Sequence, residues 1–202
     1  MSTASADAWR QLADGNDRFV EDRPDHPNQD ARRRAEVAGG QHPVAAVLGC
    51  SDSRVAAEVL FDRGLGDLFV VRNAGQVASP SALASLEYAV AVLGVPLVVV
   101  LAHDSCGAVQ AAVDAARPDA PALPPLIAAH VDGIAPAVRA ASDGTDAVEV
   151  GHAHLEATVG ALLERSELLA AAVADGSVAV IGAEYRLAEG RVHRRFAVGV
   201  AD

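Results

Sequence analysis

The sequence contains no lysine, and arginine alone supplies its 16 basic residues against 27 acidic ones, for a formal net charge of −11. Because contacts with phosphate need clustered Lys or Arg, this balance argues against a nucleic-acid partner and against binding to anionic lipid. The one dense basic run, residues 32–34, lies in an otherwise acidic region and is typical of a solvated helix face.

Long apolar runs and cysteines are also scarce. The longest apolar stretch, residues 89–102, carries Gly94 and Pro96 and is too short to cross a bilayer. The amino terminus shows no basic segment followed by an apolar one, so no secretion signal is expected. We therefore expect a soluble, cytoplasmic protein without a membrane partner. Two cysteines in such a chain favour a metal site or a reactive thiol over a disulfide framework.

The patterns divide the chain into an amino-terminal helical arm, residues 1–40, and an α/β domain, residues 41–202. The first expected helix of the arm, residues 5–21, has an apolar face that includes Trp9 and Phe19. Two prolines separate this helix from the rest of the chain. Its apolar face predicts packing on a neighbouring subunit, with packing on its own domain as a close alternative.

Strand and helix patterns alternate after the arm. The expected strands cover residues 44–49, 68–72, 97–102, 177–187 and 191–200. The expected helices cover residues 54–61, 79–93, 107–116, 126–141 and 148–174. This alternation predicts an α/β fold with a mostly parallel central sheet of about four strands, an antiparallel edge strand and flanking helices.

Both cysteines lie where expected strands end. Cys50 follows the first strand, and His103 and Cys106 follow the third, three positions apart across a turn into a helix. The carboxyl ends of parallel strands gather ligands in open α/β sheets, so these side chains should converge. Two thiolates and one imidazole form a soft ligand set that selects zinc, and three protein ligands leave a fourth position open, as in catalytic sites. Alone, either residue type would be read as part of the core.

A carboxylate and an arginine follow the first cysteine directly. Asp52 can bind the metal itself or orient a water on it, and Arg54 can grip Asp52 with two hydrogen bonds and keep it ionised. A surface ion pair with little energetic effect is the alternative.

These runs resemble a known family. Cys50–Arg54 and His103–Gly107 are similar to the paired Cys-x-Asp-x-Arg and His-x-x-Cys motifs of β-class carbonic anhydrases. The likeness extends through residues 69–75 and 85–90 and covers roughly residues 8–200. It implies a bacterial-type zinc lyase that reversibly hydrates carbon dioxide to bicarbonate and a proton through attack by zinc-bound hydroxide.

The resemblance also implies roles for individual residues. Cys50, His103 and Cys106 would hold one Zn²⁺ per chain, with Asp52 either on zinc or paired with Arg54. The domain over residues 41–202 would then be the zinc-binding catalytic domain, in a homodimer or homotetramer.

Gln41, Phe69 and Tyr88 match the family's substrate-pocket positions for carbon dioxide and bicarbonate. Without the resemblance, the two aromatic residues would pass as core and Gln41 as loop. Two other functions stay open: a related zinc hydrolase acting on carbon disulfide or carbonyl sulfide, and a non-catalytic zinc-binding protein.

Overall fold

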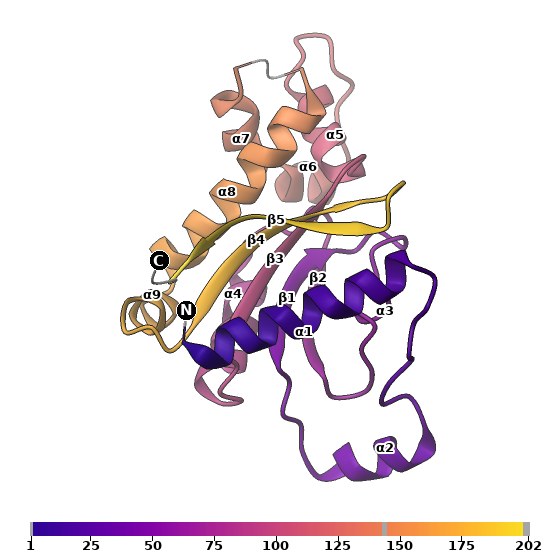
Figure 1. Cartoon of the computed structure of the whole chain (residues 1–202). Coiled ribbons are helices and arrows are strands. Elements are labelled where there is room, and N and C mark those ends of the chain that lie inside the picture. The colour runs from indigo at the N-terminus through magenta and orange to yellow at the C-terminus, as the bar shows by residue number, and fades with distance from the viewer. Residues whose placement is uncertain (1, 143–144, 200–202) are drawn as a thin grey trace.

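Five strands form one twisted sheet in the computed structural model, which describes residues 2–142 and 145–199 (Figure 1). The strands are β1 (Ala45–Cys50), β2 (Leu68–Asn73), β3 (Leu97–His103), β4 (Ala179–Arg186) and β5 (Arg191–Val198). Their order is β2-β1-β3-β4-β5, with β5 antiparallel to β4 and all other pairs parallel. The predicted fold class is therefore confirmed. Residue 200, the expected end of the last strand, lies outside the described residues.

Helices cover both faces of the sheet, which explains why β1 and β3 are buried along their whole length. The helices are α1 (Thr3–Val20), α2 (Ala31–Glu36), η1 (Val37–Gly39), α3 (Ala57–Leu60), α4 (Pro80–Ala91), α5 (Gly107–Ala115), α6 (Pro125–Val131), α7 (Ala135–Ala140), α8 (Ala147–Arg165) and α9 (Glu167–Ala174). Helices α4, α8 and α9 pack on one face, and α1 and α3 pack on the other. Of these helices, none is both long and apolar enough to cross a membrane within the described residues.

The first helix packs on the sheet of its own chain (Figure 1). Ala8 and Leu12 are 2% and 0% exposed and belong to the same apolar cluster as residues of β1 and β3. The side-chain amide of Asn16 donates to the carbonyl oxygens of Leu60 and Gly190, at 3.1 and 2.9 Å. The sequence favoured a position on a neighbouring subunit, whereas the structure buries Ala8 and Leu12 of this helix against the sheet of its own chain.

Two expected helices are each divided in two, so those predictions were wrong in extent. The segment 126–141 contains α6 and α7, with Gly133 between them and Pro136 in the first turn of α7. The segment 148–174 contains α8 and α9. Ser166 separates them because its backbone is extended and its hydroxyl caps α9 by accepting a hydrogen bond from the amide of Leu169.

Candidate metal centre

Two neighbouring parallel strands bring the two sequence clusters together. Leu48 and Gly49 of β1 pair with Val100 and Leu101 of β3, so the two strands end at the same edge of the sheet. Cys50 is the last residue of β1, and His103 is the last residue of β3.

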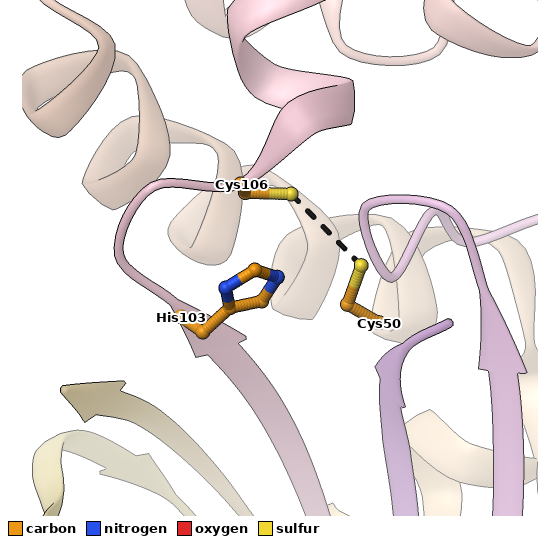
Figure 2. Close-up of side chains that lie close together, drawn as sticks. All are labelled: Cys50, His103 and Cys106. Carbon is orange, nitrogen blue, oxygen red and sulfur yellow. Dashed lines mark hydrogen bonds between the residues drawn. The ribbon is translucent and has the colours of Figure 1, made fainter. Parts of the chain in front are cut away.

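A tight turn adds the third side chain. Ser105, at φ +51°, adopts the left-handed conformation between β3 and α5. Cys106 follows it as the residue that precedes α5, and Figure 2 shows its sulfur and that of Cys50 facing each other beside the ring of His103. The structure thus unites the three predicted ligands.

The three side chains form a compact, buried group. One donor atom from each of Cys50, His103 and Cys106 lies within 4.8 Å of the other two, and the two sulfur atoms are 3.9 Å apart (Figure 2). The exposed fractions are 4%, 6% and 6%. A group of two sulfurs and one imidazole nitrogen at this spacing matches the donor set that zinc prefers.

The ring of His103 is oriented for a metal. Its Nδ1 donates to the carbonyl oxygen of Asp104 at 2.7 Å, which leaves the lone pair on Nε2. Within the described part of the chain, this buried Nε2 has no hydrogen-bond partner. An imidazole held by a carbonyl through one nitrogen and unpaired at the other is the usual arrangement of a metal-ligating histidine. The residues present therefore fit a zinc ion.

A hydrogen bond between the two sulfur atoms couples their pKa values in opposite directions. The hydrogen bond with Cys106 lowers the pKa of Cys50 to about 4, with further help from His103 and from the backbone amides of Gly75 and Asp52. The same hydrogen bond raises the pKa of Cys106. The proton of this sulfur pair is thus favoured on Cys106, and a metal ion bound by both sulfurs would displace it.

Asp52 and Arg54 form a two-pronged ion pair beside this group. The Nε and Nη2 atoms of Arg54 donate to Oδ1 and Oδ2 of Asp52 at 2.9 and 2.7 Å, and the Arg54 amide donates to Oδ1 at 2.9 Å. These contacts hold the pKa of Asp52 well below its usual range. Arg54 also donates to the carbonyl oxygen of Ser105 at 3.3 Å, which links the pair to the turn before Cys106.

The three expected pocket residues gather elsewhere in the same chain. The rings of Phe69 and Tyr88 are 6.1 Å apart, and Tyr88 and Gln41 line an open hollow of about 620 Å³. Phe69 pairs with Ala46, four residues before Cys50 along β1, which corresponds to about 13 Å of strand. Within one chain, these residues therefore do not surround the metal ligands.

Two further contacts to Cys50 were not predicted from the sequence. Arg72, at the end of β2, donates from Nε to the carbonyl oxygen of Cys50 and from Nη2 to that of Asp52, at 2.9 and 2.7 Å. The amide of Gly75 donates to the sulfur of Cys50 at 3.3 Å. The position of Arg72 at a strand end was a usable signal, whereas a backbone amide leaves no mark in the sequence.

The chain is similar to known proteins over almost its whole length. The sequence profile of a family described as carbonic anhydrase matches residues 45–192. Carbonic anhydrase 2 of Mycobacterium tuberculosis is 48% identical over 194 residues, which cover 95% of this chain and 93% of that protein. A carbonic anhydrase of Mycolicibacterium smegmatis is 47% identical over 197 residues, covering 95% and 94%.

Solved structures show the same fold. A β-carbonic anhydrase of Coccomyxa, solved in complex with acetazolamide, is similar with a TM-score of 0.72 and 27% identity, covering 82% of this chain and 78% of that one. One of two tetrameric β-carbonic anhydrases of Sordaria macrospora gives a TM-score of 0.70 and 25% identity, covering 80% and 85%.

Proposed function

Because this chain belongs to the β-class carbonic anhydrase family of enzymes, we propose that it catalyses the reversible hydration of carbon dioxide to bicarbonate and a proton. One zinc ion per chain would be held by Cys50, His103 and Cys106. The observation that carries the proposal is the convergence of these three donor atoms next to the Asp52–Arg54 ion pair. A purely structural zinc site needs no such pair.

The residues around the metal have separate tasks. A zinc ion held here would lower the pKa of its water to about 7 and so supply a nucleophile near neutral pH. Asp52 accepts a hydrogen bond from the attacking oxygen and directs its lone pair toward the carbon atom. Arg54 fixes the carboxylate through two hydrogen bonds and keeps it turned away from the metal ligands.

The substrate pocket requires a second copy of the chain in this proposal. Phe69, Tyr88 and Gln41 lie too far along the sheet to contact carbon dioxide at the metal ligands of their own chain. Tyr88 stays 46% exposed in a single copy although its ring lies beside that of Phe69, so part of this aromatic surface is open to a partner. We place this hollow against the metal centre of a partner subunit, in a homodimer or a dimer of dimers, as the tetrameric relative supports.

The experiment compares three substrates on one preparation of known zinc content. Carbon dioxide hydration is measured by stopped flow, and hydrolysis of carbon disulfide and carbonyl sulfide is measured on the same protein. We expect carbon dioxide to be turned over fastest. Preference for a sulfur-containing substrate would assign the related hydrolase activity, and no turnover of any of the three would indicate a non-catalytic zinc protein.

A further inference from the structure

A glycine amide lies next to the metal-ligating sulfur of Cys50. The Gly75 N–H, in the loop after β2, donates to this sulfur at 3.3 Å. Gly75 has φ +78°, and a Cβ at this position would lie 2.9 Å from Cβ of Ala108 and 3.0 Å from Cδ1 of Ile134. Both the backbone conformation and the close neighbours exclude a side chain, so only glycine can bring its amide to this place.

Two histidines, on α8 and α6, bind the carbonyl groups on either side of this amide. Nε2 of His154, on α8, lies 2.6 Å from the carbonyl oxygen of Gly75. Nε2 of His130, on α6, lies 2.6 Å from that of Ala74. Carbonyl oxygens only accept, so each of these Nε2 atoms carries a proton and donates. Because the Ala74 carbonyl and the Gly75 amide belong to one peptide plane, donation to that oxygen polarises the N–H toward Cys50.

The loop is closed on its other side as well. The side-chain amide of Asn73 donates to the carbonyl oxygen of Val77 at 2.8 Å and accepts from the Val77 amide at 2.7 Å. The Asn73 carbonyl oxygen accepts from Ser51, the residue after Cys50, at 2.9 Å. The two histidines therefore bind a loop whose position is already fixed by hydrogen bonds to Ser51, next to the end of β1, and within the loop itself.

The more buried histidine is suited to a fixed donor role. His154 is 2% exposed, and this burial lowers its pKa, so its ring is neutral near pH 7. A neutral imidazole with its proton on Nε2 makes a single directed hydrogen bond to Gly75. His130 is more accessible and reaches the neighbouring carbonyl from a different helix.

We propose that His154 and His130 are positioning residues that hold the Ala74 and Gly75 carbonyls, so that the Gly75 amide donates to the Cys50 thiolate and limits the charge it gives to the metal. This inference rests on the proposed zinc site. It assigns a function to two buried or half-buried histidines that contact neither the metal ligands nor the Asp52–Arg54 pair.

The direction of the effect follows from the hydrogen bond. An N–H donor withdraws electron density from a thiolate, so weakening it leaves a more electron-rich sulfur. A more electron-rich sulfur is easier to oxidise, and its charge-transfer band to a bound metal moves to longer wavelength. The metal also becomes a weaker Lewis acid, so the pKa seen in the pH profile of hydration rises.

The test uses the full chain loaded with Co²⁺, whose sulfur-to-metal band is visible. His154→Leu removes the donor, whereas His154→Gln keeps an N–H at similar reach. We expect the band of His154→Leu to move to longer wavelength and the apparent pKa of its hydration rate to rise. His154→Gln should restore both values. Thr158→Val is the matched control, since Thr158 lies one turn along α8, is also 2% exposed and has no hydrogen-bond partner for its hydroxyl within the described residues.

A second variant, His130→Leu, keeps the test valid if His154→Leu does not fold. His130→Leu removes the donor to the Ala74 carbonyl, which shares a peptide plane with the Gly75 amide, and should move the band in the same direction. If both leucine variants bind Co²⁺ with the wild-type band and the wild-type kinetic pKa, the positioning role is wrong. Wild-type protein that binds neither Co²⁺ nor Zn²⁺ would instead overturn the metal site, and with it both proposals.

Discussion

The carboxylate of Asp52 has two possible partners, the metal and the guanidinium of Arg54, and it satisfies only one of them well. In the structure both of its oxygens accept from Arg54, and the side chain of Asp52 is 17% exposed. Such a two-pronged contact to a partly buried carboxylate fixes its direction more firmly than a single surface ion pair does. The Arg54 side chain therefore decides where this carboxylate points.

Replacing Arg54 with alanine should release Asp52 to bind the metal. We expect Arg54→Ala to lose at least about 100-fold in hydration rate near neutral pH, the size of a typical loss of one positioned catalytic group. Its zinc content should stay close to wild type, because none of the three ligands changes. Arg10→Ala is the control, since Arg10 also pairs with an aspartate but lies exposed on α1. Wild-type activity in Arg54→Ala at neutral pH would contradict the role given to this pair.

The convergence of the three proposed metal ligands was predictable from the sequence, but their supporting contacts were not. Cys50 and His103 each end a continuous apolar strand. Because the carboxyl ends of parallel strands lie at the same edge of a sheet, the strand pattern was enough to predict that these two side chains lie close together. The hydrogen bonds of His130 and His154 reach backbone carbonyls 56 and 79 residues away. No periodicity or spacing encodes such contacts, because any residue presents the same carbonyl group.

The segment between α1 and α2 depends on one buried carboxylate that follows α3. Asp62 is 2% exposed and accepts from the amides of Asp25 and His26, at 2.9 and 3.0 Å, and from Nε of Arg18 at 2.6 Å. Burial alone would raise the pKa of Asp62, but these three donors outweigh it and lower the pKa. The ionised form of Asp62 therefore stabilises the fold.

Asp62→Asn should lower the free energy of unfolding by roughly 1–3 kcal/mol at pH 7, because a neutral amide replaces the charged acceptor. Since the folded pKa lies below the unfolded value of about 3.9, the stabilisation is complete above that pH and is lost as the pH falls through the folded pKa. The difference between wild type and Asp62→Asn should thus shrink below about pH 4.

Denaturant unfolding measured across this pH range checks the prediction. Asp119→Asn is the control, because the side chain of Asp119 is 82% exposed and its contact with Nε of Arg117 is long, at 3.8 Å. A gap between wild type and Asp62→Asn that persists unchanged at pH 3 would show that the ionised carboxylate is not what stabilises this segment.

Helix boundaries were the weakest part of the sequence prediction. The apolar pattern continues through Ser166, so a single helix was expected where α8 ends and α9 begins. The serine instead caps the second helix with its hydroxyl, a local hydrogen bond that competes with helix continuation. Strand positions were predicted more closely, because turn residues bound each buried run on both sides.

The chain as a whole presents a second surface that is open in a single copy. Val92 and Tyr88 are 63% and 46% exposed and line the hollow that contains Gln41. The resemblance implied a substrate pocket of Gln41, Phe69 and Tyr88, but the sequence could not show that Phe69 lies about 13 Å of strand from Cys50 of the same chain. Association of two copies would place the hollow of one chain beside Cys50, His103 and Cys106 of the other.

Val92→Glu should weaken this association by placing a charge at the proposed subunit contact. Light scattering at micromolar concentration should show wild type as a dimer or tetramer and Val92→Glu as a smaller species with zinc retained and hydration reduced. Leu126→Glu, an exposed position on α6, should leave the dimer intact. A wild-type protein that is monomeric and fully active would refute the shared pocket.

The most direct test of the proposed activity is stopped-flow hydration of carbon dioxide on preparations with measured zinc content. The hydration rate should rise in proportion to the zinc content of the preparation. It should reach its maximum at one zinc ion per chain. Cys106→Ser should lose most of its zinc and its activity together, because a hydroxyl is a far poorer zinc ligand than a thiolate. Wild-type protein that carries one zinc per chain and hydrates carbon dioxide no faster than buffer would contradict the account.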